Sequence, residues 1–430
     1  MKEVIKVILV LILISFHIDL SIGQDKISSN TISTYFREIK ENTSNYKDLW
    51  NIDLYGPILL VDSKSRIVYS NFPDSIGILK QDGEIFSGIL PNDVNIANTA
   101  IHWSGKSWAM IMLPLPENRL ERLDLLSHEL FHRSQPVLGF KMNNPANNHL
   151  DQKEGRVYLR LELEALRQAL VAKSISELNR NLTNALYFRD HRHSIYQNAK
   201  SSENFLELNE GLATYTGIFI SGRDKNQIED YFENKITEFQ NYPTFVRSFA
   251  YLTIPLYGTL LSKSDKYWNN QIDNNTNLTD FFIKSFNLQI PETLGVEIIN
   301  QYGLSEINPD ETKREERINQ LIVEYKAKFI EQPHLEIRFE KMSISFDPRN
   351  IMPIEGYGAI YPTLRVSDDW GILTVSNGAL LGTNWDKITV SEPTLINKDK
   401  VVGNGWTIDL NSRYFVEKNS ADKHYSLKKH

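Results

Sequence analysis

In this chain of 430 residues, the periodicity of apolar residues changes for the last time at Pro333 and His334. From residue 116 to this point, apolar side chains recur every three or four residues over long stretches, which is typical of helices that bury one face. After it, short alternating runs are separated by turns such as Asn377-Gly378, which indicates strands. Residues 334–430 are therefore predicted to form a C-terminal all-β domain, of a size typical for an independent module.

The segment before residue 334 contains the strand pattern first and the helical pattern after it. Short apolar runs between residues 57 and 113 predict strands, the last two being a pair over residues 98–113. Helical spacing then begins at residue 116 and continues to the end of the segment. We expect an α+β fold: a small β-sheet half over residues 24–150, a helical-bundle half over residues 151–333, and the β-domain.

The first 23 residues have the features of a secretory leader. Lys2 and Lys6 flank the start of an apolar run over residues 7–16, and small residues lead up to Gly23. The run is shorter than the roughly 20 residues that span a bilayer, so an uncleaved anchor is the weaker alternative. The sequence predicts a signal peptide over residues 1–23, an exported protein, periplasmic or extracellular, and no integral membrane segment once the leader is removed.

Composition excludes several classes of function. The chain contains no cysteine, which rules out disulfides, thiolate metal sites and a thiol nucleophile. The formal net charge of −7 argues against a nucleic-acid partner, because such proteins normally carry a basic field. Apolar residues make up 41% of the chain, as in ordinary folded proteins.

The most informative motif is His128-Glu129-Leu130-Phe131-His132. It lies in a predicted helix over residues 116–133, where four residues make about one turn, so both imidazoles can bind one metal ion. Glu129 is rotated from the histidines and can act as a general base. The alternative is a surface helix with two unrelated histidines.

A third ligand is predicted 78 residues further on, at Glu210. Ala213 and Gly217 lie on the same helical face as Glu210, and their small side chains would let this helix approach the histidine helix closely. The alternative third ligand, a histidine six residues after His132, is absent because that position is Leu138.

The two motifs, H-E-L-F-H and N-E-G-L-A-T-Y, resemble those of the gluzincin metallopeptidases, the thermolysin-like MA group, in the version with an E-G-x-A-x-Y helix. The resemblance covers roughly residues 57–288. It implies a zinc ion held by His128, His132 and Glu210, with Glu129 as the base. Thr214 occupies a position where thermolysin has an aspartate, so any partner for a histidine there must be a hydroxyl or another group.

The resemblance also implies how a substrate is held. A peptide or protein substrate would add as a strand to the edge formed by residues 98–113. A further donor must stabilise the oxyanion, and the candidates are Tyr215, His193 and Tyr196, in that order. No signature for binding a free N-terminus is found.

The sequence thus predicts a secreted zinc-dependent metallopeptidase. Two alternatives stay open: a zinc hydrolase that acts on something other than a peptide, and a zinc-containing binding protein without turnover. For the C-terminal β-domain, either a packing or targeting module or a cap over the cleft is expected. Its aromatic residues Tyr357, Tyr361, Trp370 and Trp385 are expected to form a β-core more readily than a ligand site.

Overall fold

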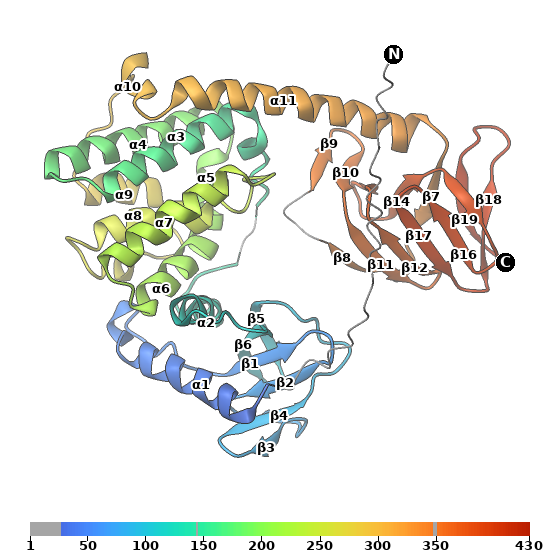
Figure 1. Ribbon diagram of the computed structural model, residues 1–430, viewed down its shortest axis with the longest axis horizontal. Helices are drawn as coiled ribbons and strands as arrows, with labels where there is room; N and C mark the ends of the chain where they lie inside the picture. Colours follow the sequence, from blue (N-terminus) through green and yellow to red (C-terminus); the bar gives the residue numbers. More distant parts are fainter. Residues whose placement is uncertain (1–26, 143–144, 347–350) are drawn as a thin grey trace, which may run out of the picture.

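The computed structural model describes residues 27–142, 145–346 and 351–430. The predicted leader lies outside the described residues. Figure 1 shows a sheet with helices beside it, a larger group of helices, and a part built of strands. This arrangement confirms the predicted mixture of helices and strands and the all-β C-terminal region.

The first part is a six-stranded sheet in the order β3-β4-β2-β1-β6-β5, so that β5 is an edge strand. β1 and β6 run parallel, and the other neighbouring pairs are antiparallel. The register of the last pair places Thr99 opposite Met110. The strands are β1 (Ile58–Asp62), β2 (Ile67–Ser70), β3 (Lys80–Asp82), β4 (Ile85–Ile89), β5 (Thr99–Trp103) and β6 (Lys106–Leu113).

Two helices, α1 (Ser29–Ser44) and α2 (Arg119–Ser134), cover one face of this sheet. Ile39 of α1 and Leu126 of α2 are fully buried there and pack into one apolar cluster with Ile111 of β6. An amphipathic helix must bury its apolar stripe against another element, and the sheet provides that surface. As a result α2 runs beside β5 and β6.

The second part is a group of helices around one large apolar core. α3 packs along α4, and α6 packs along α2 of the first part. α8 is apolar on all sides and buried, which explains its central position. Within the described ranges, no helix is both long and apolar enough to cross a membrane. The helices are α3 (Lys153–Leu170), α4 (Ile175–Ile195), α5 (Ala199–Leu206), α6 (Leu212–Ser221), α7 (Lys225–Gln240), α8 (Ala250–Leu261), α9 (Leu278–Ser285) and α10 (Val296–Asn300).

Between α5 and α6 the helix continues as a π-helical turn, η3 (Glu207–Gly211). Such turns are rare and occur frequently at functional sites. A Cβ atom added at Gly211 would lie 2.8 Å from Cβ of Ile254 on α8, so glycine allows the turn to approach that helix closely.

A long helix, α11 (Leu304–Lys326), leads from the helical part to the strands, as Figure 1 shows. Ion pairs attach it to α3: Glu311 accepts hydrogen bonds from Nε of Arg156 at 2.6 Å and Nη1 of Arg160 at 2.8 Å. Among the described residues of α11, only Glu311 and Ile307 are buried. The attachment therefore combines these ion pairs with the packing of Ile307 into the apolar core of the helical part.

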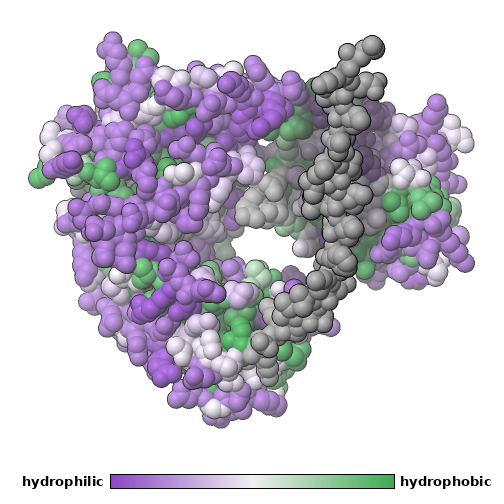
Figure 2. All heavy atoms as spheres, viewed as in Figure 1, coloured by the Kyte–Doolittle hydropathy of each residue, from purple (hydrophilic) through white to green (hydrophobic). Residues whose placement is uncertain are grey.

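The C-terminal part consists of two sheets, ordered β18-β19-β7-β14-β13-β10-β9 and β15-β16-β17-β12-β11-β8, around one apolar core. Trp370 and Tyr361 are buried in that part, as expected, whereas Tyr357 and Trp385 are exposed. Figure 2 shows an opening between this part and the first sheet. The strands are β7 (His334–Arg338), β8 (Ser343–Phe346), β9 (Met352–Ile354), β10 (Gly358–Tyr361), β11 (Leu364–Asp368), β12 (Gly371–Val375), β13 (Ala379–Gly382), β14 (Lys387–Ser391), β15 (Pro393–Ile396), β16 (Lys400–Gly403), β17 (Trp406–Leu410), β18 (Tyr414–Lys418) and β19 (Tyr425–Lys429).

Candidate metal centre

Helix α2 presents His128 and His132 to the helical part of the molecule. Asn118 caps the start of the helix by accepting hydrogen bonds from two backbone amides of the first turn. Leu126 and Leu130 are buried on the side facing the sheet. The two histidines therefore lie on another face, with ring centroids 4.6 Å apart.

The three predicted ligands are brought together. Nε2 of His128 lies 3.0 Å from Nε2 of His132, and Oε2 of Glu210 lies 3.6 Å and 3.3 Å from these two atoms. Bonds of about 2.0–2.2 Å at tetrahedral angles place ligand atoms about 3.3–3.6 Å apart. The two distances to Glu210 fall in this range, and the two imidazole nitrogens are slightly closer together. The group of two imidazoles and one carboxylate can hold a metal ion.

The other ring nitrogens are held by side chains that fix the tautomers. Nδ1 of His132 donates to Oε1 of Gln135 at 2.7 Å, and Nδ1 of His128 lies 3.3 Å from the hydroxyl of Thr214. The Thr214 hydroxyl itself donates to the carbonyl of Glu210 at 2.9 Å. When the rings are neutral, these contacts leave each Nε2 lone pair facing the cluster. Of the partners that the sequence left open for a histidine, a hydroxyl or another group, the hydroxyl of Thr214 is the one found beside His128.

The side chain of Gln135 also connects α2 to the turn η3. Its Nε2 donates to the carbonyls of Asn209 at 2.9 Å and Leu208 at 3.3 Å. Sequence reasoning missed this residue, although its position three residues after His132, about one helical turn, was a usable signal.

Small residues allow α6 to approach α2, as predicted. A Cβ atom at Gly217 would lie 2.6 Å from the backbone oxygen of Asp124 on α2. Ala213, one turn before it, is fully buried. Larger side chains at these two positions would push Glu210 away from the histidines.

Glu129 is 4% exposed, and its Oε2 has no hydrogen-bond partner among the described residues. Burial raises the pKa of this carboxyl to about 7. An unpartnered buried carboxylate oxygen is costly, so it indicates a place for a ligand, a water or a proton.

The three predicted ligands influence one another's charge. Burial raises the pKa of Glu210, but hydrogen bonds from His128 and His132 outweigh it and hold this pKa well below its usual range. Burial lowers the pKa of His128, which favours the neutral imidazole that binds metals. Burial also lowers the pKa of His132, but its hydrogen bond with Glu210 and the negative charge of Glu210 outweigh burial and raise this pKa. Glu210 is therefore ionised over the whole physiological range.

Tyr251 on α8 is a site residue that sequence reasoning missed. Its hydroxyl donates to Oε2 of Glu210 at 2.7 Å, and its ring stacks on His128 with centroids 5.9 Å apart. Burial and the negative charge of Glu210 raise the pKa of Tyr251, so the hydroxyl keeps its proton. Nη2 of Arg247 lies 3.4 Å from the other oxygen of Glu210. No local sequence signal links residues 37 and 41 positions away to Glu210.

A pocket of about 710 Å³ opens over this cluster. The two histidines, Glu129, Glu210 and Tyr251 line it, together with Asn98 and Thr99 at the start of the edge strand β5. A second pocket of about 420 Å³ adjoins it and shares Tyr251 and Arg247. Its remaining walls are mainly aromatic and aliphatic side chains of α7 and α8, including Phe239 and Leu252.

The three predicted oxyanion candidates do not line the pocket over the cluster. Tyr215 is 1% exposed and packs on Trp268 with ring centroids 4.9 Å apart, because five residues at 100° each turn it about 140° away from Glu210. Nε2 of His193 bonds Glu203 at 3.0 Å, and the hydroxyl of Tyr196 accepts from the amide of Gly155. Tyr215 and His193, the two residues predicted to be catalytic beside Glu129, therefore lie outside this pocket, whereas Tyr251 lines it and bonds Glu210.

This chain matches no protein-family model, no curated protein and no solved structure in the comparisons made. The chemical reading of the site therefore rests on its own donors. These are two imidazoles, one ionised carboxylate, a second carboxylate with a free oxygen, and a protonated phenol.

Proposed function

We propose that this protein is an exported zinc-dependent metallopeptidase. The observation that carries the proposal is the convergence of His128, His132 and Glu210 with Glu129 and Tyr251 around one pocket, beside the open edge of a sheet. Two histidines and a glutamate are a donor set that catalytic zinc sites use, whereas magnesium and calcium prefer oxygen ligands. When bound, zinc lowers the pKa of its water to about 7 and polarises a carbonyl.

The roles of the protein side chains follow from their positions. Oε2 of Glu129 is free to take a proton from the attacking water, and it can later return the proton to the leaving amine. The hydroxyl of Tyr251 donates its single proton to Glu210 in this structure, and by turning from Glu210 it can donate instead to the oxygen of the cleaved carbonyl as negative charge develops there. Arg247 adds a positive charge on the same side of the pocket.

The surroundings support an extended peptide as the substrate. β5 is an edge strand, so its outer backbone groups can pair with an added strand, and Thr99 lies in both β5 and the pocket wall. The adjoining pocket, with Phe239 and Leu252 in its walls, has room for a bulky apolar side chain next to the cleaved bond. We expect such residues to be preferred.

The test is to measure the metal content and the peptide hydrolysis of residues 24–430. We expect one zinc per chain, little zinc in Glu210→Ala, and full zinc in Glu129→Gln with activity lowered about 10²–10⁴-fold. Glu154→Gln, at an exposed position on α3, is the matched control and should behave as the parent.

Two outcomes would contradict the proposal. A parent protein that binds zinc but cleaves none of a diverse peptide library favours a hydrolase for another substrate or a binding protein. If the parent protein cannot be loaded with zinc, the proposed zinc site itself is refuted.

A further inference from the structure

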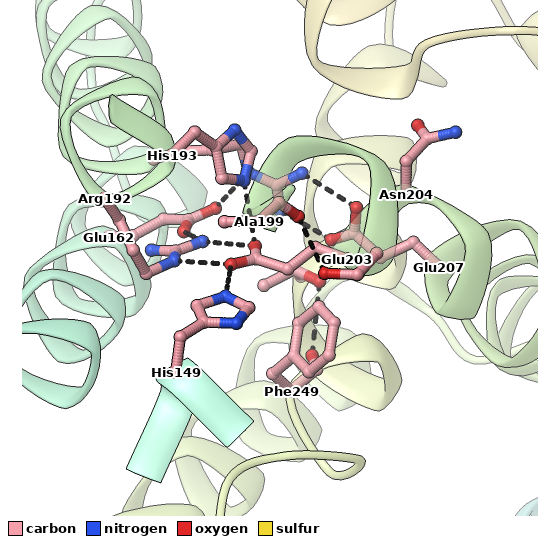
Figure 3. A network of polar contacts seen from close by, with 12 residues as sticks. His149, Glu162, Arg192, His193, Ala199, Glu203, Asn204, Glu207 and Phe249 are labelled. Carbon is pink, nitrogen blue, oxygen red and sulfur yellow. Dashed lines mark hydrogen bonds and ion pairs between the residues drawn. The ribbon is translucent and has the colours of Figure 1, made fainter. Parts of the chain in front are cut away.

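A fully buried group of charged side chains lies behind the turn that carries Glu210, and Figure 3 shows most of it. It contains three carboxylates and two guanidinium groups, each at most 1% exposed. They come from α3, α4, α5 and η3, and the residues are Glu162, Glu203, Glu207, Arg189 and Arg192.

Glu207, the first residue of η3, has every carboxylate oxygen occupied. Arg189 donates to both oxygens, at 2.9 Å and 2.6 Å, and the hydroxyl of Thr253 donates at 2.6 Å. Nε of Arg189 is fixed in turn by Glu162 at 2.7 Å. Glu207 is therefore held from two helices, α4 and α8.

These contacts connect the two elements on which the site depends. Glu207 precedes Glu210 by three residues within the same π-helical turn. Thr253 follows Tyr251 by two residues on α8. The bond between Glu207 and Thr253 therefore fixes the turn that carries the carboxylate ligand against the helix that carries the phenol bonded to it.

Stability alone is a poor explanation for this arrangement. Buried ion pairs pay a large desolvation cost, and apolar side chains of similar volume frequently stabilise a core as well or better. Directional hydrogen bonds differ from apolar contacts because they fix distance and orientation, which a metal site needs to within a fraction of an ångström.

We propose that Glu207, held by Arg189 and Thr253, is a positioning residue that sets the place of Glu210 relative to the histidines and Tyr251. This inference rests on the metal site of the proposed function but not on peptide hydrolysis. The buried charged residues are neither predicted metal ligands nor the predicted base, and the proposal gives them a role.

The test uses Thr253→Val, which keeps the shape and removes the donor, and Glu207→Gln, which removes the charge. Tyr257→Phe is the control, because the Tyr257 hydroxyl bonds Glu162 in the same buried group at 3.0 Å. Zinc affinity is measured by competition with a chelator, and the visible spectrum of the Co²⁺-loaded protein reports ligand geometry. Hydrogen exchange at residues 207–211 is followed in the metal-free protein.

We expect Thr253→Val and Glu207→Gln to lower zinc affinity about 10–100-fold and to change the Co²⁺ spectrum. Both should also speed exchange at residues 207–211, while Tyr257→Phe leaves affinity, spectrum and local exchange as in the parent. If Thr253→Val and Tyr257→Phe lose similar thermal stability and neither changes affinity or local exchange, the inference is overturned. A parent protein that binds zinc in this Glu207-dependent way but cleaves no peptide overturns the proposed function alone. If the parent binds no zinc, hydrogen exchange at residues 207–211 still tests whether Glu207 and Thr253 hold the turn in place, and unchanged exchange in Thr253→Val and Glu207→Gln overturns the inference.

Discussion

The side-chain oxygen of Gln135 lies 2.7 Å from Nδ1 of His132, and its amide nitrogen donates to the carbonyl of Asn209. The buried side chain of Gln135 thus orients one candidate metal ligand, His132, and also binds the turn η3, which carries another, Glu210. We expect Gln135→Met, similar in length but without either contact, to lower zinc affinity about 10–100-fold. Competition with a chelator measures the loss. Gln240→Met, at an exposed position, should show none, and an equal affinity for both variants would refute the role.

Tyr251→Phe removes only the hydroxyl that bonds Glu210. If this hydroxyl stabilises the oxyanion, kcat and kcat/KM should both fall about 10²–10³-fold, with KM and zinc content unchanged. Steady-state kinetics on one good peptide substrate measure this. Tyr215→Phe is the matched control, because its ring lies in the core against Trp268, and kcat should stay as in the parent. If Tyr215→Phe instead lowers kcat more than Tyr251→Phe does, the result favours Tyr215, the first candidate from the sequence.

The raised pKa of Glu129, about 7 against an ordinary value of 4.5, predicts a pH dependence of the metal-free protein. Between these values the folded state holds a proton on Glu129 that the unfolded state has lost, so the contribution of this group to the free energy of unfolding falls as pH rises and levels off above about 7. The total fall is about 3 kcal/mol, and Glu129→Gln should lack it.

Urea unfolding of both proteins in the presence of a chelator, from pH 4.5 to 8, measures this difference. Glu154→Gln provides the control for a carboxylate at an exposed position. Parallel pH curves for the parent and Glu129→Gln would show that the carboxyl titrates at its ordinary pKa.

Gly211→Ala tests the close contact between η3 and α8. The added Cβ would lie 2.8 Å from Cβ of Ile254, so overpacking should lower the free energy of unfolding by about 1–3 kcal/mol and weaken zinc binding. Gly295→Ala, where the added Cβ meets no atom within 4 Å, should be nearly neutral in both measurements. Thermal unfolding and chelator competition on the two variants decide the point, and equal results for both would argue against the contact.

Local spacing determined much of the candidate site. The predicted helix over residues 116–133 corresponds to α2 (Arg119–Ser134), and a separation of four residues places His128 and His132 on one face in any α-helix. The small residues near Glu210 also predicted a contact between segments distant in sequence, because a helix without bulky side chains on one face can approach its neighbour closely. Gly217 does so against Asp124.

Tyr251, the proposed oxyanion donor, could not be found from spacing along the chain. Tyr215 is near Glu210 in sequence, but the rotation of the helix turns it into the core. Tyr251 is 41 residues away and reaches Glu210 because α8 packs against η3. Proximity along the chain says little about proximity in a packed core, where helices distant in sequence meet.

The sequence by itself determined the change from helices to strands near residue 334 and the spacing of the two motifs, since both depend on repeats of two to four residues. The tertiary structure alone decided that Gln135 and Tyr251 join the site and that Glu207 is fully buried. These relationships arise from α2, η3 and α8 meeting in one core. Periodicity shows which face of a helix is apolar, and the meeting of three helices sets which polar side chains end within hydrogen-bond distance of one another.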